Sequence, residues 1–359
     1  MSDQLNIRLA KPEDKNNWDN FVWNHKQGLG YHFYAWKEAI ERSYYFECPY
    51  FLAESGREIK GILPMAHIHP PLGKGKLVSL PYCDLGGILA DSKDIESQLL
   101  QRALDYTKSR GIKSLEIREQ KPLPNFDSEG TKHPSKVRMV LELPTDSNTL
   151  LSSLKSKLRS QIKKPQRDGL KIKSGGIDLL DEFYSIFVRN MTHLGSPAHS
   201  KKWFEEIISK FDYRAGIKLA VLPDGTPAAG GIYLTSSETF TIPWASSLRE
   251  YNSWNPNMLL YWSFLEHATD KGYNYFDFGR SSPEDGTYKF KKQWGAEPYP
   301  LYWVNMLQNT NNGEFTTSFP ANNNPSASYG RRLAEEIIRT MPVSANRFLG
   351  TKLRKYISL

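Results

Sequence analysis

The segment DFGRSSPEDGTYKFKKQWG, at residues 277–295, holds the densest group of side chains that could do chemistry. The candidate catalytic residues in it are Asp277, Arg280, Tyr288 and Lys291, and Ser281 is a candidate substrate contact. Carboxylates and phenols can move protons, and a fixed cation stabilises the oxyanion that forms when an ester or thioester is attacked. The alternative is a solvated hairpin that Phe290 and Trp294 anchor in the core.

A second group of polar residues lies in NMTHLGSPAHS, residues 190–200, where a turn precedes a helix. His199 resembles a general base, because the unperturbed pKa of histidine lies near neutrality. A matching histidine, His32, occurs in the first half of the chain, so capping or packing is the stronger interpretation. The candidate substrate contacts in and beyond this segment are His193, Gly195, Ser196, His199, Trp244 and Asn257.

Several catalytic and metal-binding motifs are missing from the sequence. It contains no GxSxG, no Walker loop and no dinucleotide-type GxGxxG, which argues against nucleophile-elbow hydrolases and nucleotide-phosphate folds. Cys48 and Cys83 lack CxxC spacing, so we expect two buried thiols and no metal site. The composition predicts a globular protein. Without an apolar span or a secretory leader, the cytoplasm is the expected compartment.

The second half of the chain repeats a pattern of the first. Four residues recur at an offset of 167 positions: His32, Trp36, Leu52 and Ala53 match His199, Trp203, Leu219 and Ala220. Further matches are Gly61 with Gly231 and Glu116 with Asp277. We therefore predict two copies of one fold in tandem, which superpose over residues 30–120 and 197–280.

Each copy shows the same order of elements. A helix with a tryptophan precedes a hairpin, a further strand, an amphipathic helix and a short closing strand. The tryptophan helices are expected at residues 32–42 and 199–210, and the hairpins at 50–67 and 217–234. In the second copy, Asn255 with Pro256 is a credible helix start. This order predicts an α+β fold, a mostly antiparallel sheet covered by helices.

Two basic segments could contact polyanions. Residues 151–173 hold eight basic residues and one acid. Leucines and an isoleucine four residues apart, from Leu150 to Ile162, predict an amphipathic helix there that ends near Pro165. Arg159 and Lys163 on its basic stripe are candidate substrate contacts, and an ordinary solvated face is the alternative.

The second basic segment is the tail at residues 329–359, which follows an Asn-rich linker at 309–328. Pro342 predicts two short helices in place of one. The apolar stripe of the tail either docks on the protein's own sheet, which we favour, or lies in a membrane interface beside a lipid-linked substrate.

Four segments in this order resemble the FemAB-like transferases over nearly the whole chain: LVSLPYCDLGG, LKSKLRSQIKKPQRDGL, MTHLGSPAHS and FDFGRSSPEDGTYKFKKQWG. The closer likeness is to the FemAB-related proteins of exosortase and exopolysaccharide loci. The resemblance implies two tandem GNAT-like (acyl-CoA N-acyltransferase) domains, at 1–146 and 147–308, with the ligand cleft mainly in the second. It also implies that Lys291 matches the family's lysine, which meets the donor's phosphate or the developing negative charge.

The resemblance implies transfer of an acyl or aminoacyl group to an amine of a cell-envelope or exopolysaccharide precursor, by direct attack without a covalent intermediate. No tightly bound cofactor is expected, and the donor is either aminoacyl-tRNA or a thioester of CoA or a carrier protein. The R/Q-x-x-G-x-G/A loop is absent, which argues against acetyl-CoA, and no long heptad arm for tRNA occurs.

Two other functions stay open. The first is a non-catalytic protein that binds an envelope precursor or a partner protein, and the second is an RNA-binding module that rests on the basic helix alone. Clustering of Arg280, Tyr288 and Lys291 around an open cleft would favour the enzyme. Buried, salt-bridged positions would favour the binding protein.

Overall fold

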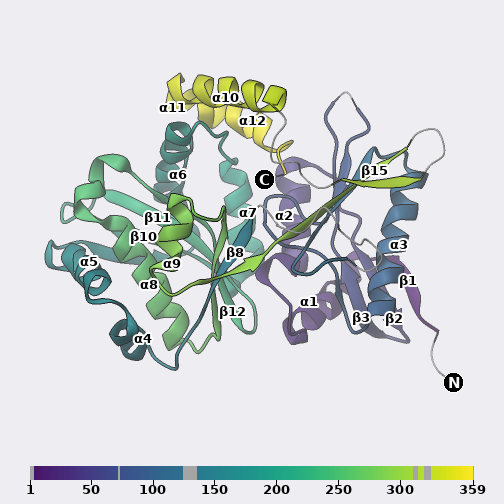
Figure 1. Ribbon diagram of the computed structural model, residues 1–359, viewed down its shortest axis with the longest axis horizontal. Coiled ribbons are helices and arrows are strands. Elements are labelled where there is room, and N and C mark those ends of the chain that lie inside the picture. The colour runs from purple at the N-terminus through teal and green to yellow at the C-terminus, as the bar shows by residue number, and fades with distance from the viewer. Residues whose placement is uncertain (1–3, 72, 124–135, 310–313, 319–324, 359) are drawn as a thin grey trace. The chain divides into compact units, whose positions relative to one another are not determined.

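In the computed structural model, the chain forms two compact units (Figure 1). The first comprises Met1–Val137, Tyr299–Asn323 and Lys355–Leu359, and the second comprises Arg138–Pro298 and Asn324–Arg354. The structure describes residues 4–71, 73–123, 136–309, 314–318 and 325–358. Within these ranges, no helix has the length and apolar character needed to span a bilayer.

Two sheets and the helices beside them form the first unit. The first sheet has the order β1-β2-β3-β6 and the second the order β16-β15-β7-β5-β4. The strands are β1 Asn6–Leu9, β2 Phe51–Ser55, β3 Glu58–Leu63, β4 Ala66–Ile68, β5 Lys76–Val78, β6 Leu89–Ala90, β7 Ser114–Glu119, β15 Tyr302–Gln308 and β16 Phe315–Ser318. The helices are α1 Lys15–Asn24, α2 Tyr34–Tyr44 and α3 Lys93–Ser109. The core lies where α3 packs against β2, β3, β7 and β15.

One mostly antiparallel sheet organises the second unit, in the order β14-β8-β13-β12-β11-β10-β9. Its strands are β8 Val137–Glu142, β9 Lys171–Gly175, β10 Ala215–Val221, β11 Pro227–Thr235, β12 Thr239–Ser247, β13 Tyr275–Ser281 and β14 Glu297–Pro300. The helices are α4 Ser147–Ser153, α5 Ser156–Arg167, α6 Leu180–Leu194, α7 Lys201–Phe211, α8 Pro256–Asp270, α9 Gly286–Lys292, α10 Pro325–Thr340, α11 Val343–Ala345 and α12 Thr351–Arg354.

Adjacent glycines on β11 lie under the two helices that flank this sheet, and the approach of α8 is the tighter one. A Cβ on Gly230 would lie 3.4 Å from side chains of α6, and a Cβ on Gly231 would lie 3.1 Å from Phe264 of α8. Successive strand residues point to opposite faces, so α6 and α8 cover opposite faces. Gly61 on β3 has the same role in the first unit, because a Cβ there would lie 2.7 Å from Ile95 of α3.

The predicted order of elements is confirmed in both units. Helix α2, the β2–β3 hairpin, α3 and β7 correspond to α7, the β10–β11 hairpin, α8 and β13. Each unit also has a short parallel pairing that ends at the matched acid. Val78 of β5 lies opposite Glu116 of β7, and Thr241 of β12 lies opposite Asp277 of β13. The superposition of the two copies stays a prediction.

The unit boundaries differ from the predicted domains 1–146 and 147–308. Strand β8 joins the sheet of the second unit, so that unit begins at Arg138. Strand β15 pairs with β7, which returns residues 302–308 to the first unit. Of the predicted linker 309–328, residues 310–313 and 319–324 lie outside the described residues.

The two basic segments also differ in part from their predictions. The basic helix is two helices, α4 and α5, and α5 continues through Pro165 to Arg167. The break at Pro342 is confirmed, because α10 ends at Thr340 and α11 begins at Val343. In the tail, helix α10 packs on α6 (Figure 1). Ser358, near the end of the tail, accepts hydrogen bonds from Lys76 of β5 and from Arg118 of β7.

We predict that Gly231→Val lowers the free energy of unfolding by about 1–3 kcal/mol, because the added side chain overpacks the contact between β11 and α8. Chemical denaturation measures the change. Gly286→Ala is the matched control, since a Cβ on this exposed glycine meets nothing within 4 Å. Equal stability of both variants and the parent chain would show that the β11–α8 contact is loose.

Candidate functional site

The candidate site lies where the pairing of β12 with β13 stops. The register ends at Thr241 opposite Asp277, although β12 continues to Ser247 and β13 to Ser281. Thr241 Oγ1 and Ser247 Oγ are buried and accept or donate no hydrogen bond among the described residues. Buried hydroxyls without partners are uncommon, so this stretch of β12 could receive polar atoms of a ligand.

Asp277 fixes the backbone at the point where the pairing of β12 with β13 ends. Its carboxylate accepts hydrogen bonds from Gly279 N and from Arg138 Nε, each at 2.8 Å. Gly279 has a φ of 74°, a conformation that favours glycine. Asp277 and Arg138 are both buried. Asp277 therefore positions this backbone through a structural ion pair, and its catalytic role stays a prediction.

Helix α9 brings Lys291 to the end of β13. The helix begins after Asp285, whose side chain accepts a hydrogen bond from Tyr288 N. The Lys291 side chain is 7% exposed, and its Nζ donates to Gly279 O at 3.1 Å and to Arg280 O at 2.7 Å. A positive charge is thus held at the point where the strand pairing has ended.

The other predicted residues of this segment gather at the same place. Arg280 follows Gly279 on β13, and Tyr288 lies one turn before Lys291 on α9; both side chains are half-buried. Ser281 is buried, and its Oγ accepts a hydrogen bond from Thr287 Oγ1 at 3.3 Å. The segment is a helix and not a hairpin, but Trp294 anchors it in the core as expected.

Comparison with known proteins agrees with this geometry. Residues 152–292 match the family model described as an acetyltransferase (GNAT) domain. The UDP-N-acetylmuramoylpentapeptide-lysine N(6)-alanyltransferase of Weissella viridescens is 26% identical over 162 residues, which cover 44% of this chain and 48% of that protein. The match thus spans about half the length of this curated relative.

Three solved structures share the fold at low sequence identity. FemX gives a TM-score of 0.65 at 14% identity, covering 83% of this chain and 96% of its own. L-PGS from Bacillus licheniformis gives 0.56 at 10% identity, covering 93% and 99%. The C-terminal domain of a putative lysylphosphatidylglycerol synthetase from Agrobacterium fabrum gives 0.55 at 14% identity, covering 82% and 92%.

The chain thus contains a GNAT domain and has the fold of FemX, and it is similar to the FemAB-like transferases.

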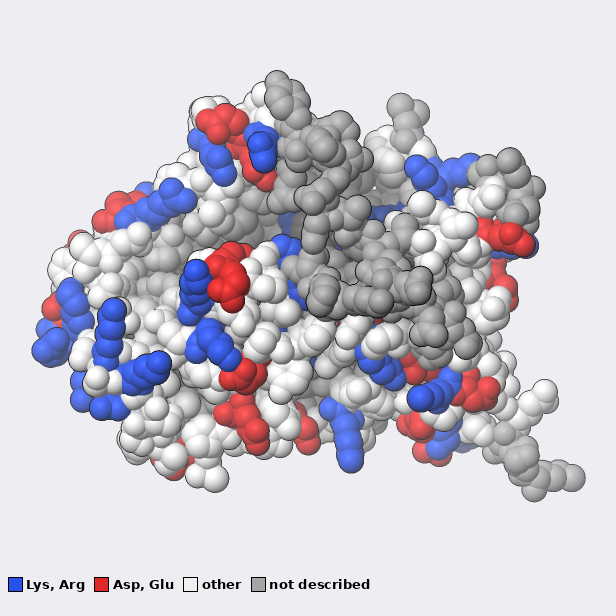
Figure 2. Space-filling model, in the orientation of Figure 1, with Lys and Arg blue, Asp and Glu red and all other residues white. Residues whose placement is uncertain are grey.

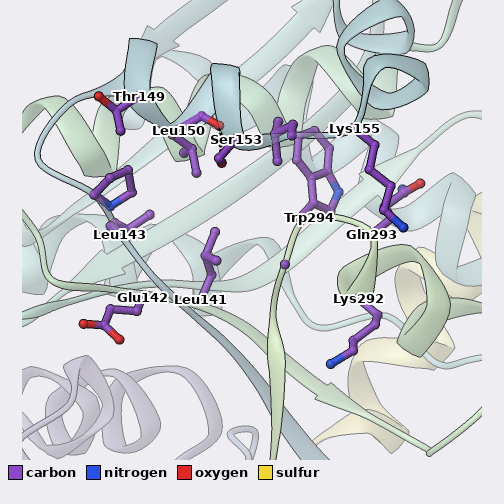
Figure 3. A pocket seen from close by; sticks show the side chains of 13 residues that line it. Leu141, Glu142, Leu143, Thr149, Leu150, Ser153, Lys155, Lys292, Gln293 and Trp294 are labelled. Atoms are coloured by element: carbon purple, nitrogen blue, oxygen red, sulfur yellow. Dashed lines mark hydrogen bonds between the residues drawn. The ribbon is translucent and has the colours of Figure 1, made fainter.

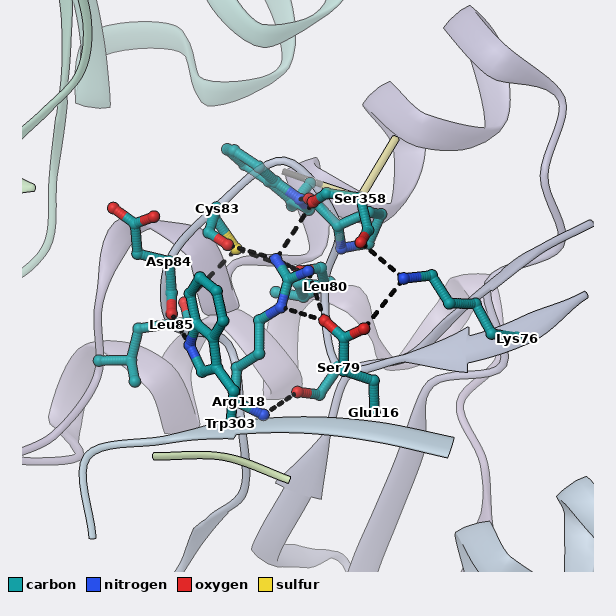
Figure 4. A network of polar contacts seen from close by, with 12 residues as sticks. Lys76, Ser79, Leu80, Cys83, Asp84, Leu85, Glu116, Arg118, Trp303 and Ser358 are labelled. Atoms are coloured by element: carbon teal, nitrogen blue, oxygen red, sulfur yellow. Dashed lines mark hydrogen bonds and ion pairs between the residues drawn. The ribbon is translucent and has the colours of Figure 1, made fainter. Parts of the chain in front are cut away.

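In the first unit, the position that matches Gly279 is occupied by Arg118 and its hydrogen-bond partners (Figure 4). Arg118 stands two residues after Glu116, as Gly279 stands two residues after Asp277. The buried guanidinium donates to Glu116 Oε1 and to the carbonyl oxygens of Leu80, Cys83 and Ser358. The Trp303 ring covers it, with its centroid 5.1 Å from the guanidinium carbon.

This network explains the segment LVSLPYCDLGG in structural terms. Ser79 Oγ accepts a hydrogen bond from Arg118 N, and the carbonyls that bind the guanidinium belong to the same loop. Burial raises the pKa of Glu116, but Arg118 and Lys76 outweigh it and lower that pKa to about 2. Cys83 is buried, and burial raises the pKa of its thiol. The part of this segment that follows β5 forms turns and bends.

Four predicted substrate contacts lie in structural surroundings, and their contact with a substrate stays a prediction. His199 is buried, its ring lies 5.7 Å from that of Trp203, and Trp244 packs edge-on against it. Burial, and then Arg354, lower the pKa of His199 well below its usual value. Gly195 and Ser196 lie under the tail: a Cβ on Gly195 would be 2.5 Å from the α10 backbone, and Ser196 O accepts a hydrogen bond from Asn346.

The remaining predicted contacts lie on other elements of the second unit. His193 is exposed near the end of α6, and Asn257 is half-buried in the first turn of α8. Arg159 donates to the carbonyls of Ser152 and Leu154 and so ties α4 to α5. Lys163 is exposed on α5. The structure does not bring these four side chains to Lys291 by any hydrogen bond among described residues.

Sequence reasoning missed Arg138 and Thr241. Arg138 left a signal, because a charged residue inside the apolar run VRMVL needs a buried partner. Thr241 left none, since threonine is ordinary in a strand.

The buried Glu119, beside Arg118, gives a pH-dependence of stability. Burial, and then the charge of Glu96, raise the pKa of Glu119 to about 8, against a lowering by the Ile88 N–H. Because the carboxyl pKa is higher in the folded state, this group lowers stability only above the pKa of the unfolded chain, near 4.5. The free energy of unfolding then falls as the pH rises toward 8.

We therefore predict that the free energy of unfolding falls by up to about 1.4 kcal/mol per pH unit between pH 5 and pH 8, and that Glu119→Gln removes this dependence. Denaturation curves at several pH values measure it. The exposed Glu205→Gln is the control and should leave the slope in place. A slope that persists in Glu119→Gln would assign it to another group.

Proposed function

We propose that this chain transfers an acyl or aminoacyl group from an activated donor to an amine of a cell-envelope precursor, and that the second unit carries the reaction. The contrast between matched positions supports this most strongly. Arg118 closes the end of the parallel pair in the first unit. Gly279 has no side chain to do so in the second, where Lys291 supplies a fixed charge.

The proposed step is a direct displacement. The neutral amine of the acceptor attacks the carbonyl carbon of the donor, a C–N bond forms, and the ester C–O or thioester C–S bond breaks. The amine loses a proton, and the leaving hydroxyl or thiol gains one. Negative charge develops on the carbonyl oxygen between these events. The charge of Lys291, already held by two carbonyls, is placed to stabilise it without reorganisation.

The donor is either an aminoacyl-tRNA or an acyl thioester of CoA or a carrier protein. The Weissella relative is named for alanyl transfer to a UDP-linked muramoyl pentapeptide, which supports an aminoacyl donor and a peptidoglycan-type acceptor. An exopolysaccharide precursor is the alternative acceptor. Lys and Arg side chains gather where α5 lies (Figures 1 and 2), and exposed residues such as Lys157 and Lys163 could contact tRNA phosphates.

A cytoplasmic protein peripheral to the inner membrane fits the tail. Several large apolar side chains of the tail remain exposed, whereas Ile338 is buried. The exposed ones are Leu333, Ile337, Phe348, Leu349 and Leu353. Exposed basic residues, among them Arg332, Arg339 and Lys352, stand beside them. Apolar and basic side chains together suit the interface of an anionic membrane that carries a lipid-linked acceptor.

A non-catalytic binding protein is the second candidate. The buried ion pair of Asp277 with Arg138 and the burial of Lys291 favour it, because both are arrangements that a scaffold would share. In that case the chain would bind the acceptor and transfer nothing from any donor.

We predict that Lys291→Met lowers the rate of transfer by about a hundredfold or more, because it removes one electrostatic contact to the oxyanion. The assay uses alanyl-tRNA with a UDP-linked muramoyl pentapeptide. Lys292→Met, which removes an exposed neighbour, is the control and should keep turnover. Full turnover of Lys291→Met would reject the role of this lysine.

The same variant must be checked for folding, because the Lys291 side chain is buried. Leaving two buried carbonyls without their donor costs about 1–3 kcal/mol. Unfolding midpoints and acceptor binding, measured beside the rate, separate lost catalysis from lost structure. Acceptor binding by the parent chain without any transfer would establish the second candidate.

We also predict that Ile337→Glu abolishes flotation with anionic liposomes, because it places a charge in the apolar patch of the tail. Ile337 is 54% exposed, so the substitution leaves the core intact. Ser344→Glu adds the same charge at an exposed polar position and is the control. No flotation of the parent chain, or equal flotation of both variants, would remove the membrane role.

A further inference from the structure

A cavity of about 580 Å³ opens on the second unit beside the segment that follows α9 (Figure 3). Its walls come from the end of β8, from α4, from the junction of α4 with α5, and from residues 292–295. The volume lies in the range of small-molecule sites in proteins. None of the residues assigned to the transfer reaction lines it.

The wall of the cavity is mainly apolar. Leu150 and Leu154 are buried beneath it, and the Trp294 ring is 1% exposed. The Trp294 indole N–H donates no hydrogen bond to a described residue. Figure 3 shows the nitrogen edge of this ring turned toward Lys155 and Gln293 at the rim. An apolar body of a ligand would therefore bury itself against leucine and indole carbon.

The rim of the cavity carries one unpaired cation. Lys155 is exposed and forms no ion pair or hydrogen bond through its side chain with the residues described. Lys292, also at the rim, is paired with Glu297 at 2.6 Å, and Glu142 is the one acid that lines the cavity in the described chain. Lys155 is therefore the charge available to a ligand.

Lys155 is also the N-cap residue of α5, directly before Ser156. Its side chain makes no cap hydrogen bond to the helix. The first N–H groups of a helix point back along its axis and favour a phosphate. Three kinds of hydrogen-bond donor thus lie beside one apolar cavity: the Lys155 ammonium, the first N–H groups of α5 and the Trp294 indole N–H. Together they suit an anion with several oxygen atoms, such as a phosphate.

We propose that this cavity binds an amphiphilic phosphate, with the aliphatic chain against Trp294 and the leucines and the phosphate at Lys155. A lipid phosphate and a free phosphate share the anionic chemistry, and the apolar wall favours the lipid. The inference depends on the cavity alone and not on the transfer reaction.

Calorimetric titration of the full chain with decyl phosphate, below its micelle concentration, tests the proposal. We expect binding that Lys155→Ala weakens about tenfold, the loss of one charged hydrogen bond. Lys157→Ala is the matched control, because it removes an exposed lysine of the same helix that does not line the cavity. Ser153→Phe, which fills the cavity from an exposed position, should abolish binding.

Two further titrations separate the sources of affinity. Inorganic phosphate and decyl maltoside should each bind at least tenfold more weakly than decyl phosphate. Inorganic phosphate as tight as decyl phosphate would overturn the lipid assignment, and decyl maltoside as tight would overturn the role of the anion. An equal loss in Lys155→Ala and Lys157→Ala would overturn the site. Unfolding midpoints of the variants confirm that each is folded.

Discussion

A carboxylate at the end of a parallel strand pair, buried in Asp277 and half-buried in Glu116, is the constraint on which both units depend. A carboxylate in such a place requires a cation and hydrogen-bond donors, since removing one partner costs several kcal/mol. The first unit satisfies Glu116 with Arg118 from the same strand, and with Lys76. The second satisfies Asp277 with Arg138 from the neighbouring strand β8. The source of the cation then determines whether the space beyond the acid is filled.

With the cation supplied by β8, the residue two positions after Asp277 is free to be glycine. Gly279 turns the backbone with a φ of 74°, and its own carbonyl and that of Arg280 then accept hydrogen bonds from Lys291. An arginine at this position would itself occupy the space, as Arg118 does in the first unit. The same local geometry therefore gives a network around an arginine in one copy and a lysine held by two backbone carbonyls in the other.

The sequence predicted what depends on local pattern and on internal repetition. The order of elements followed from periodicity, and the structural interpretation of His199 followed from its match with His32 at the constant offset of 167. The match of Glu116 with Asp277 followed from a further repeat at an offset of 161. Pairings between distant segments did not follow. Neither the bond of Arg138 to Asp277 nor the pairing of β15 with β7 leaves a local period, because each is set by which strands become neighbours. The surroundings of Gly195 escaped for the same reason, since they are made by α10, far along the chain.

The tail has buried polar residues that hold it on the protein and, in the same segment, exposed apolar residues. Asn346 is buried and donates to Thr192 Oγ1 and Ser196 O, so this part of the tail completes the end of α6. Ser358, at the end of the chain, accepts from Arg118 in the first unit. Removing the whole tail would leave those donors and acceptors unpaired, and lost membrane binding would then be confounded with lost folding. Ile337 and Phe348 lie on the exposed side of the same segment, so point substitutions there separate the two effects.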